Sequence, residues 1–311
     1  MSAVTTTKER VALPAFSGIT RVRKWLGGSF SPYLFVAPFF LLFAAFSAYP
    51  LLYALQLSFT YWHGDGAPRF IGLSNYSFLL TDNFFWQSLG NSLVLWLLII
   101  PAQIISAVVI AALLSKKTLR FRWFFRTAFM TSFVVPLVAL ALVWKVLFDQ
   151  DAGAVNALLQ MIHISHIGWL TTEAWAKPTL ALLVLWKNSG FSILLMLAAI
   201  QGVPLEYHEA ASLDGANALQ QFWYITVPHL RRTISFLVVT STLAVFQMFL
   251  EPDILTKGGP YNSTTTAGYH LLSYINNADF GTGAANSVLL MILMIAISLV
   301  MVRLLRAGEE I

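Results

Sequence analysis

The sequence contains no cysteine and very little charge. Of its 311 residues, 11% are Asp, Glu, Lys or Arg, whereas soluble globular domains carry about 25%. Without cysteine, the chain forms no disulfide, no thiolate metal site and no cysteine nucleophile. So few charges do not cover a water-exposed surface of this size, and the composition excludes a soluble globular protein, a disordered chain, a coiled coil and a nucleic-acid binder. The sequence also lacks a Gly-x-x-x-x-Gly-Lys-Ser/Thr phosphate loop, so we predict no ATP hydrolysis by this chain.

Hydrophobic residues make up 58% of the chain instead, and the mean hydropathy is +0.71. A membrane-spanning helix needs about 20 mainly apolar residues. We count six such stretches and predict an all-α membrane protein with six transmembrane helices. They are Tyr33–Phe59, Leu89–Leu114, 127–148, Thr179–Gln201, 233–255 and 280–302. The first stretch is longer than the apolar region of a cleavable signal peptide, so we expect it to remain as an anchor.

The basic residues fall mainly in alternate connecting segments. Cytoplasmic segments of membrane proteins carry the excess of Lys and Arg. One set of segments holds 14 of the 19 basic residues: Lys8, Arg10, Arg21, Arg23, Lys24, Lys116, Lys117, Arg120, Arg122, Arg126, Arg231, Arg232, Arg303 and Arg306. This asymmetry predicts cytoplasmic N and C termini. We therefore expect cytoplasmic tails at 1–30 and 307–311 and a lipid-embedded, multi-pass domain at 31–306.

Three segments on the opposite side, 61–88, 149–178 and 256–284, are long enough for short helices but too short for another domain. One of them contains His163 and His166, whose spacing suits a metal site. No third ligand is identifiable, so we interpret them as a solvated pair and predict no metal site. No Ser/His/Asp arrangement stands out, and we predict no catalytic residue.

The cytoplasmic loop 202–232 differs from the other connecting segments because it combines acidic and small residues. Glu206 and Glu209 lie in the first turns of a predicted helix, where the positive end of the helix dipole favours acids. Ala210 and Ala211 add helix propensity with little bulk. Such a helix fits a groove of a partner protein. The alternative is an amphipathic connector on the lipid surface, which the acidic residues disfavour because anionic headgroups repel them.

The ends of this helix are also marked in the sequence. Pro204 suits a helix start, because its missing N–H is not needed there. Asp214 and Gly215 are expected to end the helix. We expect Asp214 to cap a second helix that runs to about Val227, and Pro228 to stop it before the fifth span.

The same loop resembles the EAA signature of permease subunits of binding-protein-dependent ABC importers. The matching residues are Glu209-Ala210-Ala211, Asp214-Gly215-Ala216, Phe222, Ile225 and Val227-Pro228. Further segments resemble the carbohydrate-uptake type, similar to maltose and glycerol-phosphate permeases. They are Ala37-Pro38, Tyr49-Pro50, Ser58-Phe59, 70–76 (Phe-Ile-Gly-Leu-Ser-Asn-Tyr), 186–191 (Trp-Lys-Asn-Ser-Gly-Phe) and 255–260 (Leu-Thr-Lys-Gly-Gly-Pro). The resemblance covers roughly 33–306. It departs at Arg232, where many relatives have proline, and at Leu250, where many have an acid.

The resemblance implies a type I ABC importer permease fold, with 31–306 as the permease domain, in a bacterial or archaeal plasma (inner) membrane. It implies half of a translocation pore, completed as a heterodimer by a second permease subunit. It also implies two cytoplasmic ATP-binding subunits that hydrolyse ATP, an extracytoplasmic solute-binding protein and a carbohydrate substrate. The chain itself is then not an enzyme and needs no cofactor. The implied ATPase-coupling residues, on a coupling helix around 206–213, are Glu206, Glu209, Ala210, Ala211, Asp214 and Gly215.

Two other functions remain open at this point. One is a permease subunit for glycerol phosphate or another sugar phosphate or polyol. The other, of a different class, is an ion-coupled secondary transporter that acts alone. That function needs carboxylates inside the membrane, and the central parts of the predicted spans contain none.

Polar and aromatic residues within the spans are the candidates for the translocation path, because intramembrane polar groups usually face the bundle interior. These candidates are Trp186, Asn188, Gln247 and Asn286. The alternative for the amides is hydrogen bonding between helices, and for Trp186 it is packing at an interface. We expect Lys187 to face a wet cavity, to pair with an acid such as Glu251, or to lie nearer the membrane surface.

Overall fold

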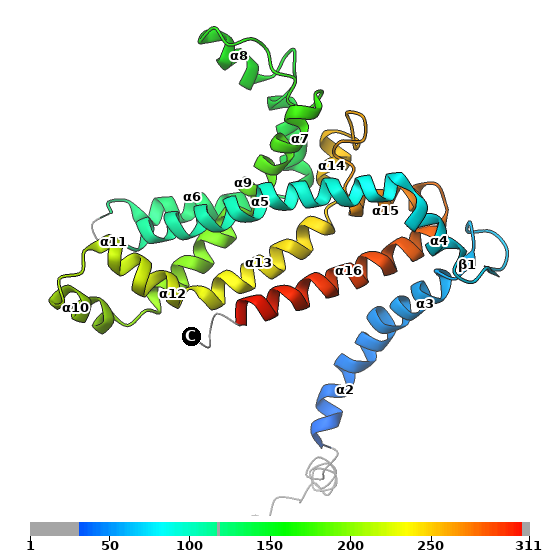
Figure 1. Cartoon of the computed structure of the whole chain (residues 1–311), viewed down its shortest axis with the longest axis horizontal. Coiled ribbons are helices and arrows are strands. Elements are labelled where there is room, and N and C mark those ends of the chain that lie inside the picture. Colours follow the sequence, from blue (N-terminus) through cyan, green and yellow to red (C-terminus); the bar gives the residue numbers. More distant parts are fainter. Residues whose placement is uncertain (1–30, 117–118, 307–311) are drawn as a thin grey trace, which may run out of the picture. The chain divides into compact units, whose positions relative to one another are not determined.

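The structure, a computed structural model, describes residues 31–116 and 119–306 (Figure 1). The predicted tails 1–30 and 307–311 lie outside the described residues. The chain divides into two compact units, the first ending at Ala54 and the second beginning at Leu55.

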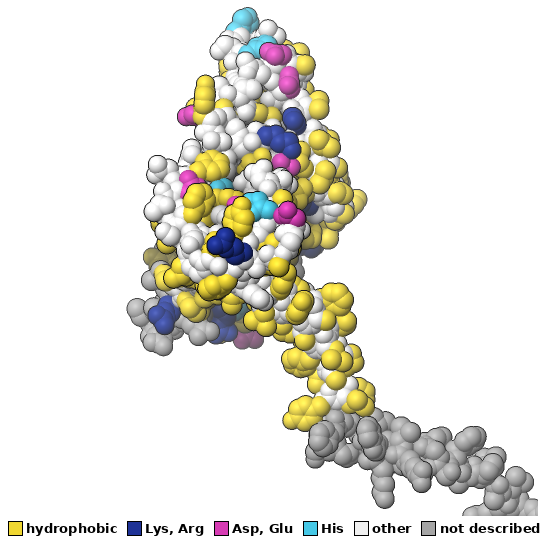
Figure 2. All heavy atoms as spheres, turned by 90° about the vertical axis from the view of Figure 1, so that its right-hand side faces the viewer, with side chains coloured by type: hydrophobic (Ala, Val, Ile, Leu, Met, Phe, Trp, Pro, Cys, Tyr) yellow, Lys and Arg dark blue, Asp and Glu magenta, His cyan; other side chains and the backbone are white. Residues whose placement is uncertain are grey.

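The first unit is helical throughout its described part. Helix α2 (Ser31–Phe43) passes into the π-helical turn η1 (Ala44–Ala48) and then into α3 (Tyr49–Leu57), which ends in the second unit. The π turn ends two residues before Pro50, which has no N–H for a regular helical hydrogen bond. In Figure 2 the described part of this unit is covered almost entirely by hydrophobic side chains. A helix that is apolar on all sides suits lipid rather than water.

The second unit is mainly helical, with one small sheet. Strand β1 (Thr60–Tyr61) pairs antiparallel with β2 (Arg69–Phe70), a hairpin that the prediction of an all-α chain missed. The remaining elements are α4 (Ser74–Thr81), α5 (Asn83–Ser115), α6 (Arg122–Val134), α7 (Leu137–Leu147), α8 (Ala154–Met161), α9 (Glu173–Gln201), α10 (Leu205–Leu213), α11 (Ala218–Gln221), η2 (Phe222–Thr226), α12 (Val227–His229), α13 (Arg231–Phe246), α14 (Leu250–Leu255), α15 (Ala267–Asn276) and α16 (Phe280–Arg306). Short helices α4, α8 and α15 lie in the three segments where short helices were predicted.

Among the described residues, four helical segments are long and apolar enough to cross a membrane. They are Tyr33–Leu57, Asn83–Ser115, Glu173–Gln201 and Phe280–Arg303. Helices α6 and α7 form a fifth candidate if the bent pair counts as one span. These segments agree with five of the six predicted stretches, although α5 and α9 each begin six residues earlier than predicted.

The third predicted stretch, 127–148, is not one straight helix. It breaks between α6 and α7, whose axes differ by 98°. The residue before a proline is disfavoured in the helical region, and Val135, which precedes Pro136, is extended with φ −60° and ψ 129°. The sequence-based prediction of a continuous helix was therefore wrong at this point.

The fifth predicted stretch, 233–255, is interrupted as well. Helix α13 has only 16 residues, and α14 begins after a short non-helical segment. Gly268 of α15 approaches this interruption so closely that a Cβ there would lie 2.6 Å from the carbonyl oxygen of Gln247. Thr266 donates a hydrogen bond to the carbonyl of Met248 over 2.5 Å. The segment before α15 thus satisfies a backbone group that the interrupted helix leaves free.

The core of the second unit lies between α5 and α9. Fully buried Leu95 and Ile99 on α5 belong to one apolar cluster with Leu180 and Leu183 on α9. A polar contact ties a third helix to this pair, because the amide of Gln103 donates to Ser192 on α9 (2.7 Å) and Ser241 on α13 (3.1 Å). Helices α5, α9 and α13 therefore form one packed group.

The loops at one end of this bundle are held by buried asparagines. We call this part the loop end: β1, β2, α4, residues 256–266 and α15. Asn75 of α4 donates from Nδ2 to the carbonyls of Ser58 (3.0 Å) and Thr60 (2.9 Å). Its Oδ1 accepts from the hydroxyl of Thr282 in α16, at 3.5 Å. One amide thus joins β1, α4 and α16.

Asn91 of α5 holds a second part of the loop end. Its Nδ2 donates to the carbonyls of Asn262 (2.8 Å) and Thr265 (2.9 Å). The neighbouring hydroxyl of Ser92 accepts from the N–H of Ala267 at 2.9 Å, at the start of α15. Residues 256–266 are therefore fastened to the first turns of α5.

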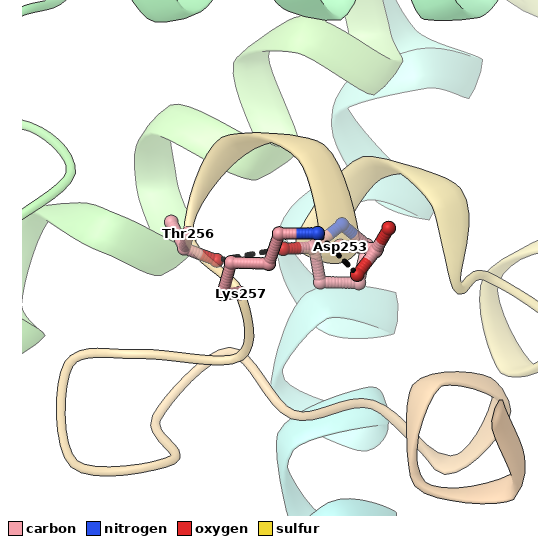
Figure 3. Close-up of polar contacts among 4 residues, drawn as sticks. Asp253, Thr256 and Lys257 are labelled. Carbon is pink, nitrogen blue, oxygen red and sulfur yellow. Dashed lines mark hydrogen bonds and ion pairs between the residues drawn. The ribbon is translucent and has the colours of Figure 1, made fainter. Parts of the chain in front are cut away.

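The segment around α14 carries an exposed ion pair (Figure 3). Lys257 lies 2.9 Å from the carboxylate of Asp253, four residues earlier. The hydroxyl of Thr256 donates to the carbonyl of Pro252 at 3.1 Å. These contacts are local and follow the last turn of α14.

Candidate coupling loop and translocation path

The helix predicted over 206–213 is present as α10 (Leu205–Leu213), with Pro204 at its N-cap position. Glu206 lies in its first turn, and none of its residues is buried. Leu213 at its last turn is 91% exposed, the most exposed large hydrophobic side chain of the described residues. In the part of the chain that the structure describes, neither Glu206 nor Glu209 forms an ion pair or a side-chain hydrogen bond. The helix therefore presents charged and apolar groups that have no partner among the described residues.

Gly215 ends α10 in a left-handed conformation, with φ +82°. The N–H of Ala216 donates to the carbonyl of Ala211 (2.8 Å), and that of Gly215 to the carbonyl of Ser212 (3.1 Å). This pair of bonds is the Schellman arrangement, in which glycine avoids the Cβ penalty of the left-handed residue. An added Cβ at Gly215 would meet no atom within 4 Å, so only the backbone angle demands glycine.

The second helix of the loop begins later than predicted. Asn217, not Asp214, caps it: the side chain of Asn217 accepts from the N–H of Gln220 (2.9 Å), and the side chain of Gln220 accepts from the N–H of Asn217 (2.8 Å). Asp214 is instead the C-cap of α10. Gly215 lies between the C-cap Asp214 and the N-cap Asn217, and its left-handed backbone turns the chain before α11 starts.

Pro228 does not stop this helix. It lies inside α12, and the turn before it is the π helix η2, in which the N–H of Val227 donates to the carbonyl of Phe222. The hydrogen bonding thus shifts from α to π directly before Pro228, the residue that has no N–H to donate. Within η2, the side chain of Trp223 is 57% exposed and that of Tyr224 is 81% exposed. The helix ends at His229, two residues beyond the predicted end at about Val227, and α13 begins at Arg231.

A groove of about 480 Å³ lies between α10 and the segment η2–α12. Ala210, Ala211 and Asp214 line one side of it together with Tyr207. The other side is formed by Tyr224, Ile225, Pro228 and His229. Three of the six predicted coupling residues therefore line this groove, whereas the two glutamates and Gly215 do not.

Hydrogen bonds fix α10 against the helix that follows. His208 Nδ1 and Gln221 Oε1 are 3.2 Å apart, and Gln221 Nε2 donates to the hydroxyl of Ser212 at 2.9 Å. Gln221 also donates to the carbonyl of Ala216 at 3.1 Å. The loop is thus an organised helical unit rather than a flexible connection.

The four predicted path residues lie in different surroundings. Trp186 is 41% exposed, Asn188 is half-buried, and Gln247 is exposed with its amide 3.5 Å from the sulfur of Met294. Asn286 is fully buried, and neither its Nδ2 nor its Oδ1 has a hydrogen-bond partner. Among the described residues, no hydrogen bond or ring contact joins any two of these four side chains.

Lys187 does not pair with Glu251. Its ammonium donates to backbone carbonyls at the end of α6, at Ser132, Phe133 and Val135. Of the predicted alternatives for this lysine, the ion pair with Glu251 is therefore wrong, because the ammonium is hydrogen-bonded to backbone carbonyls instead.

In the described residues, no group of three or more His, Cys, Asp or Glu side chains is placed to hold a metal ion. His163 has a left-handed backbone, with φ +62°, in the turn after α8. The structure adds no third ligand to the pair His163 and His166.

The arrangement of helices matches chains in two solved structures of a bacterial ABC transporter. The chain superposes on a subunit of a bacterial ABC transporter involved in the import of alginate with a TM-score of 0.81, 21% identity, and coverage of 92% of this chain and 99% of that chain. A second structure, of the alginate transporter with its alginate pentasaccharide-bound periplasmic protein, gives a TM-score of 0.77, 22% identity, and coverage of 90% and 96%. The chain therefore has the type I ABC permease fold.

The sequence identifies the family. Residues 104–309 match the binding-protein-dependent transport system inner membrane components, and the chain belongs to this family.

Several relatives are similar over most of their length. A probable ABC transporter permease of Bacillus subtilis, YurN, is 33% identical over 90% of this chain and 97% of its own. The lactose transport permease LacF of Rhizobium radiobacter is 36% identical over 80% and 83%. The arabinooligosaccharide transport permease AraP of Halalkalibacterium halodurans is 34% identical over 90% and 89%.

Proposed function

We propose that this chain is the transmembrane permease subunit of an ABC transporter that imports a carbohydrate, either a sugar or an oligosaccharide. The names of its relatives support this class of solute, because they include permeases for lactose and arabinooligosaccharides. The two similar structures come from an importer of an acidic polysaccharide. The family supports a membrane protein that works with a binding protein.

The observation that carries the coupling role is the exposure of α10. Its glutamates and Leu213 protrude without partners in the described chain, while the helix itself is rigidly held by Gln221. A rigid helix with unpaired acids and an exposed leucine suits a groove of another protein. We propose that α10 is the coupling helix and that Glu206, Glu209, Ala210, Ala211, Asp214 and Gly215 form the contact with an ATP-binding subunit.

In this proposal the chain forms half of a pore. The second half is a related permease subunit, and two cytoplasmic ATP-binding subunits and an extracytoplasmic solute-binding protein complete the transporter. ATP binding closes the ATP-binding subunits and moves α10. A shift of the pore from 1:99 to 99:1 between two states needs about 5.5 kcal/mol, which ATP binding supplies from outside this chain.

We propose six spans with both termini in the cytoplasm of a bacterium or archaeon, and the tails 1–30 and 307–311 on that side. The spans are α2–α3, α5, α6–α7, α9, α13–α14 and α16. The bent pair α6–α7 and the interrupted pair α13–α14 each count as one. The 14 basic residues on one set of loops support this orientation.

Trp186, Asn188 and Gln247 remain the candidates for direct solute contact, because each retains exposed surface in this conformation. Asn286 is closed off, so its amide reaches a solute only after α16 moves relative to its neighbours. Its unpartnered amide supports such a movement, since a buried amide without a hydrogen bond is costly.

A permease subunit for glycerol phosphate or another sugar phosphate or polyol remains the alternative within the class. The ion-coupled transporter is the alternative of a different class. The family supports the dependence on a binding protein and not that second alternative.

The test uses the complete transporter in proteoliposomes with its ATP-binding subunits and binding protein. Glu209→Arg reverses a charge on α10, and Glu173→Arg reverses an exposed glutamate in the first turn of α9 as a matched control. We expect Glu209→Arg to lower ATP-dependent uptake and retention of the ATP-binding subunits at least about tenfold, a change of about 1.4 kcal/mol. The control variant is expected to retain both.

A second pair of variants tests Gly215. A tryptophan at Gly215 and one at Gly66 both add bulk at left-handed glycines with no atom within 4 Å of the added Cβ. Only Gly215→Trp is expected to block coupling. Unchanged uptake in both Glu209→Arg and Gly215→Trp contradicts the coupling role, and uptake by the chain alone contradicts the ABC permease function.

A further inference from the structure

The break between α6 and α7 creates a group of backbone carbonyls that a continuous helix would have bonded. In an α-helix the carbonyl of residue i accepts from the N–H of residue i+4. Pro136 has no N–H, so it gives none to the carbonyl of Ser132, four residues earlier. The chain then turns by 98°, which takes the next N–H groups away from the end of α6. Unpaired carbonyls are costly inside a membrane because no water is available to bond them.

Lys187 meets these carbonyls from the neighbouring helix. Its Nζ lies 3.4 Å from the carbonyl oxygen of Ser132, 2.5 Å from that of Phe133 and 2.7 Å from that of Val135. An ammonium has three N–H donors and no acceptor, which matches three carbonyls. The same Nζ lies 5.4 Å from the centre of the Phe133 ring, within the range of a cation–π contact.

The position of this lysine along α9 is unusual. Lys187 lies at the midpoint of the helix, fourteen residues after Glu173 and fourteen before Gln201. A charged side chain in the middle of a span is rare and usually functional. Here the charge faces the carboxyl end of α6, where the helix dipole is negative. The break and the lysine therefore compensate each other: each is unfavourable without its partner.

Close packing joins α6 and α9 beside the ammonium. A Cβ at Gly190 would lie 2.1 Å from the carbonyl oxygen of Phe129, so only glycine allows this approach. The hydroxyls of Ser132 and Ser189 are 3.4 Å apart. These contacts fix the distance between the helices, and the lysine fixes where α6 ends.

We propose that Lys187 is a positioning residue for transport: its ammonium acts as a tethered cation at the α6–α7 break and sets the direction in which α7 leaves α6. Trp186 and Asn188, the candidates for solute contact, lie on the same turn of α9. The break thereby positions α7 relative to the solute path. This inference rests on the proposed transport function, and its test has a readout that is independent of transport.

Three substitutions separate the charge from the volume of the side chain, in the complete transporter in proteoliposomes. Lys187→Met keeps most of the length and removes the donors, whereas Lys187→Arg keeps a cation with several donors. Lys145→Met removes an exposed lysine of α7 and is the matched control. We expect uptake to fall at least about tenfold in Lys187→Met. It is expected to stay within about threefold of the wild type in Lys187→Arg and in the control.

The second readout is the bend itself. The native chain has no cysteine, so Ala128→Cys on α6 and Val146→Cys on α7 give a unique pair of exposed spin-label sites. We expect a single narrow distance distribution in the parent and in Lys187→Arg. In Lys187→Met the distribution is expected to broaden and shift to longer distances, because α7 is no longer held at a steep angle to α6.

Chemical rescue distinguishes a tethered cation from ordinary packing. Lys187→Ala leaves space for the missing part of the side chain, and propylammonium supplies that part with its charge. Added propylammonium is expected to raise uptake several-fold in Lys187→Ala and to narrow its distance distribution, and to change neither in Lys187→Met, where the side chain fills the space. If the Lys187→Met protein is not produced in the membrane, the proposal is tested by comparing Lys187→Ala in the presence and absence of propylammonium.

Uptake and distances in Lys187→Met equal to those of the parent overturn the proposal, as does a Lys187→Ala variant that does not respond to propylammonium. If the parent transporter shows no ATP-dependent uptake, the proposed function fails. The distance distributions and their response to propylammonium then still decide whether Lys187 holds the break.

Discussion

The loop end and the coupling loop 202–232 lie at opposite ends of the second unit, and they use polar side chains in opposite ways (Figure 1). At the loop end, Asn75 and Asn91 are buried, and each donates two hydrogen bonds to backbone carbonyls. In the coupling loop, Glu206 and Glu209 are exposed and bond to nothing in the described chain. Buried and bonded polar groups shape the protein itself, whereas exposed and unbonded ones are available to another molecule.

The largest expected effect comes from replacing a buried asparagine at the loop end. Asn75→Leu leaves the carbonyls of Ser58 and Thr60 and the hydroxyl of Thr282 without this partner. Each buried unsatisfied group costs about 1–3 kcal/mol, so we expect the free energy of unfolding to fall by about 3 kcal/mol. Asn217→Ala in the coupling loop removes only an exposed helix cap, with an expected loss of about 1 kcal/mol. Thermal unfolding in detergent measures both, and equal losses contradict the distinction.

Replacing a glycine by alanine is also expected to cost more stability at the loop end than in the loop 202–232. A Cβ at Gly281 would lie 2.2 Å from the carbonyl oxygen of Thr60, so α16 and β1 have to separate in Gly281→Ala. Overpacking of this kind costs about 1–3 kcal/mol. In Gly215→Ala the new Cβ meets nothing, and the left-handed angle alone costs about 1 kcal/mol. Unfolding temperatures rank the two variants, with the exposed Gly90→Ala of α5, where an added Cβ meets nothing within 4 Å, as a control for the added methyl group.

A smaller effect is expected from acid at the loop end. Burial lowers the pKa of His270 from its ordinary value of 6.5, although the carboxylate of Asp82 opposes the shift. The folded protein therefore binds this proton less readily than the unfolded chain, so the free energy of unfolding falls as the pH drops through 6.5. The loss is complete once the pH is below the folded-state pKa. Unfolding temperatures measured between pH 7.5 and 5 test this.

The matched variant for this pH effect is His270→Gln, which keeps polar atoms at the site and cannot charge. The difference between the parent and His270→Gln isolates the contribution of this histidine, because both proteins share all the other histidines. A difference that does not change with pH contradicts the assignment.

The smallest expected effect concerns the exposed ion pair of Figure 3. Asp253→Asn removes the partner of Lys257, whose side chain is 68% exposed. Exposed pairs contribute about 0.2–1 kcal/mol and are screened by salt. We expect a loss of stability in low salt that is the smallest of the series and disappears in high salt. A loss as large as that of Asn75→Leu would show that the exposure of a side chain does not predict its contribution to stability at the loop end.

Parts of this fold follow directly from the sequence. The spans carried by α5, α9 and α16 are long apolar runs, and lipid accepts such runs without help from the rest of the chain. Helix α10 was predictable because Pro204 and Gly215 mark its ends through local backbone chemistry. Local rules are sufficient where neighbouring residues alone determine the conformation.

The interruptions were not predictable in the same way. Hydropathy reads 127–148 as one stretch, because Val135 and Pro136 are both apolar. The cation that bonds the carbonyls at this break lies 51 residues beyond Pro136, on another helix. The importance of Asn91 was missed for a similar reason, since its partners, Asn262 and Thr265, belong to a distant loop. For Asn75 the segment 70–76 carried a signal through its family resemblance, but that signal did not reveal what the amide binds.

Helix α9 runs without interruption for 29 residues, a length of about 44 Å at 1.5 Å per residue. One end leads toward α10, and its midpoint carries Lys187, which donates to the carbonyl of Phe133 at the α6–α7 break. A stiff rod of this kind does not absorb a displacement along its length. If α10 is the coupling helix as proposed, a displacement of α10 is transmitted along α9 toward the α6–α7 break, and α9 acts as a rigid connection between the ATP-binding subunits and the proposed solute path.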